Sequence, residues 1–181
     1  MVRSMVRRFL VGIVVLAACR TERMVPGEAK APPPPGARAA DEAAILTALN
    51  TYYDRLSRRS WREFRTSFWP GAIIAVRWHA PADVRPTVHI QTLDQFLAET
   101  KNGPDRLAVF EEQMVHHEVR AYGDLAAVWA TFRATFGWPG QTPTTHFGVD
   151  AFQLLKGQGE WRIVSLAFTE ELPGDSLPKD R

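Results

Sequence analysis

The stretch that decides the fold is LAVFEEQMVHHEVRAYGDLAAVWATFRATFGW, residues 107–138. Its two halves, 107–122 and 125–138, are rich in β-branched and aromatic residues, and the short turn Gly123-Asp124 joins them. A connection this short that contains glycine is typical of antiparallel strands. The stretch therefore predicts a hairpin whose strands are much longer than the usual five or six residues. We expect strands of this length to bend around an interior.

The segments on either side extend this pattern into a fold class. Two further strands follow the hairpin, over residues 144–156 and 161–171, and complete a four-strand meander. Ahead of it, apolar residues recur at helical spacing from Asp41 to Ser57, and the Asp41 carboxylate can cap that helix. Helices first and a meander afterwards is an α+β order.

Shorter elements connect the first helix to the meander. The segment from Ser60 to Glu63 has the spacing of a capping box and predicts a second helix, which Pro70-Gly71 should end. The same spacing at Thr92 to Gln95 predicts a third helix. Between these helices we expect a strand over residues 72–78, a loop over 81–86 and a short edge strand over 87–90.

Three local segments resemble a known fold family. The strand-turn-strand of residues 119–126, the strand 148–154 and the hairpin 159–164 are similar to those of the NTF2-like superfamily, which includes nuclear transport factor 2, ketosteroid isomerase and the SnoaL-type cyclases. The resemblance covers residues 41–172. It implies an α+β cone, with N-terminal helices packed on a strongly curved antiparallel sheet, and it identifies no reaction.

The N-terminus has the pattern of an export signal. Arg7 and Arg8 precede an apolar run over residues 9–18, which is too short to span a bilayer, since that takes about 20 residues. The following Leu16-Ala17-Ala18-Cys19 resembles the lipobox of bacterial lipoproteins. This resemblance implies that residues 1–18 are a signal peptide and that an acylated Cys19 holds the protein on the membrane. The alternative is that Cys19 is an incidental small hydrophobic residue.

The next segment, residues 19–40, has a run of prolines at 32–35 and almost no core-forming side chains. It predicts a Pro-rich tether, and an SH3-type ligand is the alternative. In lipoproteins of this kind an aspartate after the cysteine favours the inner membrane. Because Arg20 stands there, the resemblance favours the periplasmic face of the outer membrane if the organism has one. Residues 173–181 are expected to be a flexible tail.

Charge and motifs exclude several function classes. The excess of 22 basic over 20 acidic side chains comes from the arginines of the signal, so we predict no nucleic-acid partner. The arginines of residues 55–65 should close one helix and continue on the wet face of the next, while contact with an anionic lipid surface is the alternative.

The adjacent His116 and His117 point to opposite faces of a strand, and no metal spacing, phosphate loop or CxxC pattern is present. We therefore predict neither a metal nor a cofactor.

One acidic residue stands out in the meander. Asp150 lies among apolar residues in FGVDAFQLL, residues 147–155, on the same strand face as Phe152. Burial there would raise the pKa of the carboxyl group and make Asp150 a candidate catalytic proton shuttle. The alternative is an acid whose hydrogen bonds are satisfied by a tryptophan, tyrosine or arginine of an adjacent strand. The ligand pocket around it is expected to comprise aromatic residues and two histidines, namely Trp61, Phe64, Trp78, His79, Phe110, His117, Phe132, Trp138 and Phe152.

These observations favour an exported, lipid-anchored envelope protein whose cone binds a small apolar ligand or serves as an accessory module. The alternative is an acid/base isomerase or cyclase of the SnoaL or ketosteroid-isomerase type that uses Asp150, and a purely structural partner of an envelope machine is a third hypothesis. Trp129 and Val149 also make the outer sheet face apolar. That face predicts a homodimer, and a monomer with an aromatic-rich surface is the alternative.

Overall fold

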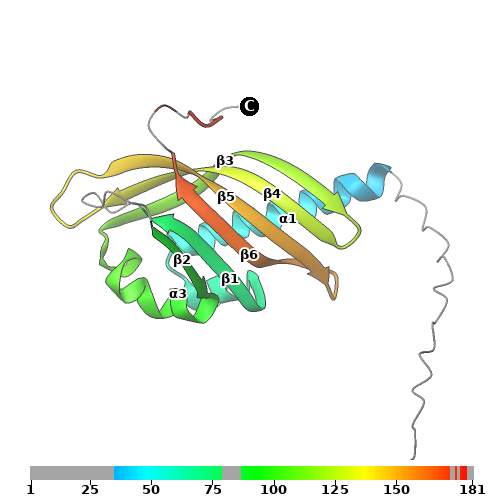
Figure 1. Cartoon of the computed structure of the whole chain (residues 1–181), viewed down its shortest axis with the longest axis horizontal. Coiled ribbons are helices and arrows are strands. Elements are labelled where there is room, and N and C mark those ends of the chain that lie inside the picture. Colours follow the sequence, from blue (N-terminus) through cyan, green and yellow to red (C-terminus); the bar gives the residue numbers. More distant parts are fainter. Residues whose placement is uncertain (1–34, 79–86, 172–173, 175, 179–181) are drawn as a thin grey trace, which may run out of the picture. The chain divides into compact units, whose positions relative to one another are not determined.

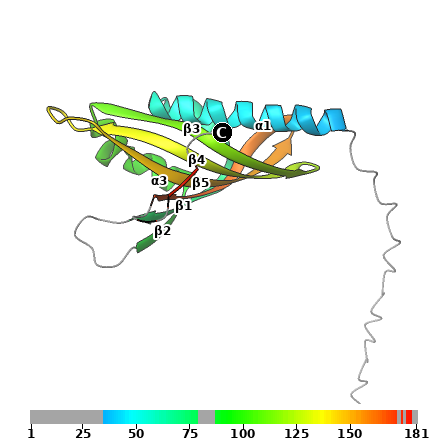
Figure 2. The same ribbon diagram turned by 90° about the horizontal axis from the view of Figure 1, so that it is seen from above.

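A long helix opens the described part of the chain and lies along one face of the sheet (Figures 1 and 2). The structure is a computed structural model that describes residues 35–78, 87–171, 174 and 176–178. The expected signal peptide, Cys19 and most of the expected tether lie outside this part. Helix α1 (Pro35–Ser57) starts earlier than the expected Asp41, because proline is well tolerated in the first turn of a helix.

The inner side of α1 is a continuous apolar stripe. Ile45, Leu49, Tyr52 and Leu56 recur at helical spacing and are buried, as the sequence predicts, and the neighbouring Tyr53 is buried beside them. The Tyr52 ring packs edge-on against Phe68 and Phe152 at centroid distances of 5.8 and 5.3 Å. This stripe holds the helix against the sheet.

The two expected capping boxes have different outcomes. Helix α3 (Leu93–Glu99) has one, because the Gln95 amide donates to Thr92 Oγ1 and the Thr92 amide donates to Gln95 Oε1. Helix α2 (Trp61–Arg65) has none, since the Ser60 side chain makes no capping bond.

The predicted helix end at Pro70-Gly71 is wrong. Helix α2 ends at Arg65, and strand β1 (Phe68–Trp78) already contains this dipeptide, at an irregularity in its pairing with β6 (Glu160–Glu170). Gly71 has φ +83°, a conformation that a glycine adopts without steric cost. The dipeptide therefore bends a strand here.

The predicted four-strand meander is confirmed. Two short 3₁₀ turns, η1 (Thr100–Asn102) and η2 (Pro104–Arg106), lead into β3 (Val109–Tyr122), and β4 (Leu125–Gly137), β5 (Thr144–Gly157) and β6 follow with antiparallel pairing. The edge strand β2 (Thr87–Thr92) pairs with β1, and the order is β2-β1-β6-β5-β4-β3. The expectation of a fully antiparallel sheet is wrong at one place, because β1 pairs with β6 in parallel. The segment between them contains β2, α3 and the strands β3 to β5, so nothing forces β1 and β6 to run in opposite directions.

The sheet is strongly curved, as long strands predict. Its pairing shifts register between Met114 and His116 on β3 and between Ser165 and Ile163 on β6, and such bulges bend and twist a strand. The core fills the inner face of the bend, where Val128, Phe152 and Leu166 are buried together with the stripe of α1. Helices on the inner face of a curved sheet form the expected α+β cone.

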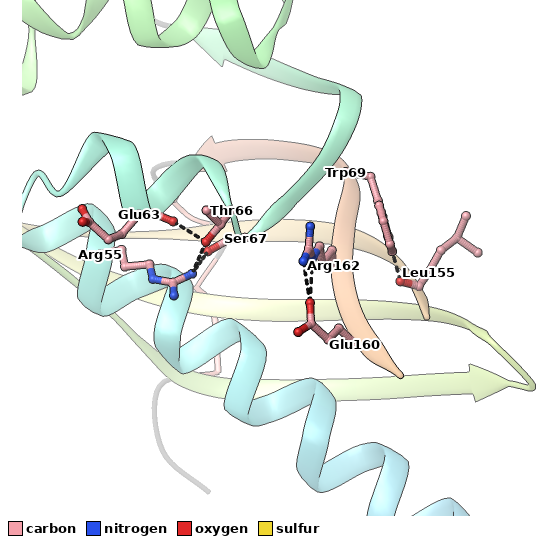
Figure 3. Close-up of polar contacts among 8 residues, drawn as sticks. All are labelled: Arg55, Glu63, Thr66, Ser67, Trp69, Leu155, Glu160 and Arg162. Carbon is pink, nitrogen blue, oxygen red and sulfur yellow. Dashed lines mark hydrogen bonds and ion pairs between the residues drawn. The ribbon is translucent and has the colours of Figure 1, made fainter. Parts of the chain in front are cut away.

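Polar contacts join the helices to the strands at the edge of this core (Figure 3). Arg55 Nη1 of α1 donates to Thr66 Oγ1 and Ser67 Oγ, both at 3.0 Å, at the junction of α2 and β1. Trp69 Nε1 of β1 donates to the Leu155 carbonyl of β5 at 2.9 Å. The Arg55 bonds tie α1 to the start of β1, and the Trp69 bond ties β1 to β5.

The other arginines of the basic stretch make local contacts too. Arg58 forms an ion pair with Asp54 one helical turn away, and Arg65 pairs with Asp94 of α3. Arg59 Nη2 donates to the Leu107 carbonyl at 2.9 Å. These contacts agree with a structural role for the stretch.

The outer face of the sheet carries exposed apolar side chains. Leu125, Trp129 and Leu155 are 51%, 55% and 42% exposed, whereas Val149 is buried. The homodimer expected through this face stays a prediction. Within residues 35–78 and 87–171, no helix combines the length and apolar content that a membrane crossing requires.

Candidate functional site

A cavity of about 580 Å³ lies between the helices and the inner face of the sheet. Most of its lining is aromatic or aliphatic, and every layer of the fold contributes to it. The lining residues are Tyr52, Leu56, Phe64, Ile74, Phe96, Asn102, Gly103, Pro104, Leu107, Phe110, Glu112, Phe132, Phe136, Trp138, Asp150, Leu166, Phe168 and Glu170. The volume is within the range of small-molecule sites.

The exposure of the lining residues separates the mouth of the cavity from its depth. Asn102, Trp138 and Glu170 are exposed and mark the mouth, where the Arg106 guanidinium lies 5.6 Å from the centre of the Trp138 ring. The buried part of the lining includes Asp150. A ligand that enters past Trp138 therefore reaches a carboxyl group inside an apolar chamber.

The buried carboxyl group has one direct partner. Asp150 of β5 is 2% exposed, and Tyr53 Oη of α1 donates a hydrogen bond of 2.6 Å to its Oδ2. The sequence left two alternatives open for Asp150, a proton shuttle in a cavity or a satisfied buried acid. The structure combines features of both, and the tyrosine comes from a helix where an adjacent strand was expected.

Burial changes the acidity of this group. Removal from water raises the pKa of Asp150 to about 7, although the hydrogen bond from Tyr53 favours the ionised form and opposes this rise. Burial likewise raises the pKa of Tyr53 well above its usual value, and the nearby Asp150 charge adds to the effect. Asp150 can therefore be either protonated or ionised near neutral pH, whereas the tyrosine stays a hydrogen-bond donor.

A second carboxyl group lines the same cavity. Glu112 lies on the inner face of β3, and its main chain is fixed by Ser57, whose Oγ accepts from the Glu112 amide at 2.8 Å and donates to the Glu112 carbonyl at 3.0 Å. Desolvation raises the pKa of Glu112 well above its usual value, and the charge of Asp150 raises it further. The two carboxyl groups therefore disfavour simultaneous ionisation.

Glu112 is missing from the sequence-based prediction of the site, although a signal was available. Along the first half of β3, side chains alternate between faces, and Phe110, Glu112 and Met114 share the inner one. The same alternation on β5 predicts the inward position of Asp150.

Four of the predicted aromatic residues line the cavity together. They are Phe64 of α2, Phe110 of β3, Phe132 of β4 and Trp138, which directly follows β4. Phe152 is not in the lining, and its ring packs edge-on against those of Tyr52 and Tyr53. It therefore forms part of the core surface on which the two tyrosine rings pack.

The remaining predicted residues have other positions. Trp61 packs against Phe64 and donates from Nε1 to Asp105 at 2.8 Å, outside the cavity lining. His117 is exposed on β3 and is also outside the lining. Trp78 is the last residue of β1, and His79 lies outside the described residues.

Gly148 makes room for the aromatic wall. It lies two residues before Asp150 on the same face of β5, opposite Phe132 of β4. A Cβ atom at this position would collide with the Phe132 ring and with the Thr169 carbonyl. The glycine therefore lets the Phe132 ring cross the strand beside Asp150.

The charge of the lining restricts the kind of ligand. Among the described residues that line the cavity there is no Lys, Arg or His, while three of them are acidic. An anionic ligand would enter without a cationic partner, at a high desolvation cost. A neutral carbonyl or hydroxyl group fits better, because a protonated carboxyl group can donate to it and an ionised one can accept from it. The described residues also contain no group of three His, Cys, Asp or Glu side chains arranged to hold a metal ion.

The cone with an apolar cavity on its concave side defines the class of protein as NTF2-like, as the sequence resemblance implied. A family model for the SnoaL-like domain matches residues 37–167, and the chain belongs to this family. No curated protein matches the sequence.

Solved structures share this fold. A proposed scytalone dehydratase from Novosphingobium aromaticivorans is 12% identical, with a TM-score of 0.63 over 76% of this chain and 88% of that one. A proposed dehydratase of the NTF2-like family from Streptomyces avermitilis is also 12% identical, with a TM-score of 0.61 over 74% and 99%. A protein of unknown function from Mycobacterium tuberculosis is 13% identical, with a TM-score of 0.64 over 81% and 82%. At these identities the similarity shows the fold alone.

The raised pKa of Asp150 predicts a specific pH dependence of stability. Between about pH 4, where an unfolded aspartate ionises, and about pH 7, where the folded Asp150 does, the folded state binds the extra proton. The free energy of unfolding should therefore fall as pH rises through this window, by up to about 1.4 kcal/mol per pH unit, and Asp150→Asn should remove this part of the fall. Urea titrations of both proteins at several pH values measure it, with Glu112→Gln as the comparison. An equal slope in wild type and Asp150→Asn would contradict the assignment.

Proposed function

We propose that the domain binds a small, neutral, apolar molecule with one carbonyl or hydroxyl group. The observation that carries this proposal is the cavity of about 580 Å³, which is apolar at its walls and has carboxyl groups of raised pKa among its lining. Apolar walls supply affinity, and the few polar groups set the orientation of the ligand.

A second candidate function is favoured by the titration of Asp150. A carboxyl group with a pKa of about 7 is matched to proton transfer at neutral pH, and a second carboxyl group of raised pKa can, when protonated, donate to a developing oxyanion. In such a reaction Asp150 takes a proton from a carbon next to a carbonyl group, and Glu112 donates to the carbonyl oxygen. Return of the proton to another carbon completes an isomerisation. The proposed dehydratases among the structural neighbours also favour acid/base chemistry.

We further propose that the mature protein is anchored through an acylated Cys19, on the periplasmic face of the outer membrane if the organism has one. The support is the lipobox-like Leu16-Ala17-Ala18-Cys19 behind an apolar run. An anchored cone would collect or convert apolar molecules close to the bilayer, where they concentrate.

The binding proposal predicts unequal effects for two tryptophans. Trp138→Ala, at the mouth of the cavity, should weaken binding of a bicyclic ketone such as tetralone about 10-fold or more, which corresponds to about 1.4 kcal/mol. Trp129→Ala is the matched control, because Trp129 is similarly exposed, 55% against 44%, but lies on the outer face. Thermal shift and calorimetry measure both.

The choice of ligands sharpens this experiment. The corresponding bicyclic carboxylate, naphthoate, should bind far more weakly than the ketone, because no described lining residue is cationic. Equal binding of ketone and carboxylate, or equal loss in both tryptophan variants, would count against binding in this cavity.

The catalytic alternative makes its own prediction. If the cavity runs acid/base chemistry, Asp150→Asn should lower kcat at least 100-fold on a bicyclic β,γ-unsaturated ketone and change its Kd little, since the amide is isosteric. The wild-type rate should rise with pH through about 7, as the base ionises. Proton exchange at the carbon next to the carbonyl, followed by NMR, detects even slow turnover. No exchange above the rate in buffer would leave binding as the function.

The anchor is tested in cells. Mass spectrometry of the N-terminal peptide should find Cys19 as the first residue with an acyl modification, and Cys19→Ser should release the protein from the membrane fraction or block its processing. A bare Cys19 inside an uncleaved chain would overturn the anchor without affecting the cavity.

A further inference from the structure

Three of the exposed apolar side chains of the meander gather at one end of the sheet. Tyr122, Leu125 and Leu155 are 88%, 51% and 42% exposed and pair in one row across β3, β4 and β5. We call these three residues the apolar tip. They lie beside the β3–β4 and β5–β6 turns, and the close-up in Figure 3 shows the Leu155 side chain pointing away from α1.

The apolar tip is built rigidly. The Lys156 amide donates to the Asp124 carbonyl at 2.9 Å, which joins the two hairpins next to their turns. Trp69 Nε1 holds the Leu155 carbonyl at 2.9 Å, and the Trp69 ring fills the space over Gly157, where a Cβ would collide with it. The three side chains thus form one contiguous apolar row on a backbone that these bonds hold in place.

The chain leaves the domain at the same end. Figures 1 and 2 show the start of α1 next to the two hairpins, and Lys156 Nζ bonds Asp41 Oδ1 of the early part of α1 at 2.7 Å. Between Cys19 and Pro35 the chain can span at most about 55 Å, at roughly 3.4 Å per residue. An anchor at Cys19 therefore holds this end of the domain within about 55 Å of the bilayer.

We propose that the apolar tip docks into the surface of the membrane that carries the anchor. This inference rests on the proposed acylation of Cys19. The tether supplies a high effective concentration, so a contact too weak to recruit the free domain is still occupied in the anchored protein. Docking would hold the cone in one orientation, with its mouth directed away from the lipid.

The order of residues along the outer face suits the interface between a membrane and water. Behind the leucines, the next row contains Arg120, and the row after it contains Trp129, about 13 Å from Leu125. If the leucines enter the acyl boundary by 5–10 Å, typical of interfacial elements, then Arg120 and Trp129 lie at headgroup level, which both residue types favour.

A second copy of the chain is a poorer occupant. Large side chains at the centre of a patch dominate most protein interfaces. Here the central row of the outer face has a single large apolar side chain, Trp129, whose strand partners Glu118 and Ala151 are polar or small. The charged residues beside the apolar tip are three basic and three acidic ones, namely Arg120, Lys156, Arg162, Asp41, Asp124 and Glu160. Because these charges balance, docking should depend little on anionic lipid.

The test uses the full acylated protein with an environment-sensitive dye on Asp124→Cys, beside the tip. The chain has a single natural cysteine, so an acylated Cys19 leaves the introduced one as the only free thiol. On reconstitution into vesicles, quenching of this dye by aqueous iodide should fall several-fold, whereas a dye on Lys101→Cys in η1 should stay accessible. Vesicles of phosphatidylcholine alone and with phosphatidylglycerol should give the same result.

Matched variants tie the effect to the tip. Leu125→Gln with Leu155→Gln should restore full quenching, whereas Val88→Gln with Ile90→Gln should not, although Val88 and Ile90 on β2 are 67% and 71% exposed. The mass of the Cys19 peptide is read on every sample. An acylated, vesicle-bound protein whose dye stays in water overturns docking and leaves the anchor intact, and a bare Cys19 overturns both. Protection that disappears when the protein is diluted tenfold in the same lipid means that a second copy covers the tip, which also overturns docking.

Discussion

The fold depends on one constraint, the packing of α1 across the concave side of a bent sheet. Tyr52 and Tyr53 are neighbours in the helix, and both rings reach Phe152 of β5, at centroid distances of 5.3 and 6.1 Å. The register between helix and sheet that this packing sets also places Tyr53 Oη on Asp150, at 2.6 Å. The same contact therefore belongs to the core and to the site. A shift of α1 by one residue would separate the hydroxyl group from the carboxyl group and leave a buried acid without a partner, which is costly.

Curvature explains why this core has an unfilled end. The bulges of β3 and β6 bend the strands, and α1 follows the concave side only as far as Ser57, where the Ser57 hydroxyl bonds both main-chain groups of Glu112. Beyond that point α2, α3 and the 3₁₀ turns cover the sheet at a distance, and the cavity occupies the remaining volume. Contacts with α1 thus hold both acidic residues of the site, Glu112 through its main chain and Asp150 through its carboxyl group, and this gives them the rigidity that an apolar cavity with few polar groups needs.

Much of the fold follows from the sequence, because long alternating strands joined by short glycine turns can be arranged in a sheet in only a few ways. The four-strand meander, the stripe from Ile45 to Leu56 and the inward position of Asp150 follow from periods of 3.6 and 2. Periodicity does not predict which distant segments pair. For this reason the parallel pairing of β1 with β6 and the strand conformation at Pro70-Gly71 differ from expectation. In the site, periodicity selects a strand face and cannot say which ring faces a void. Phe152 therefore lies under the tyrosines, while Phe136 and Phe168, absent from the prediction, line the cavity.

The two proposed roles of the cavity differ in what they require of the raised pKa values. A binding site for a neutral carbonyl ligand needs carboxyl groups that stay protonated and donate to it, and burial favours that form. A hydrogen bond that stabilises the ionised form works against such binding. Tyr53 makes such a bond and holds the pKa of Asp150 near 7, lower than burial alone would set it. Glu112 makes no such bond among the described contacts, and burial and the charge of Asp150 both raise its pKa well above the usual value. Because the two carboxyl groups disfavour simultaneous ionisation, one can accept a proton while the other still carries one, as proton transfer between two positions of a ligand requires. The tyrosine is thus the feature of the site that simple binding does not explain.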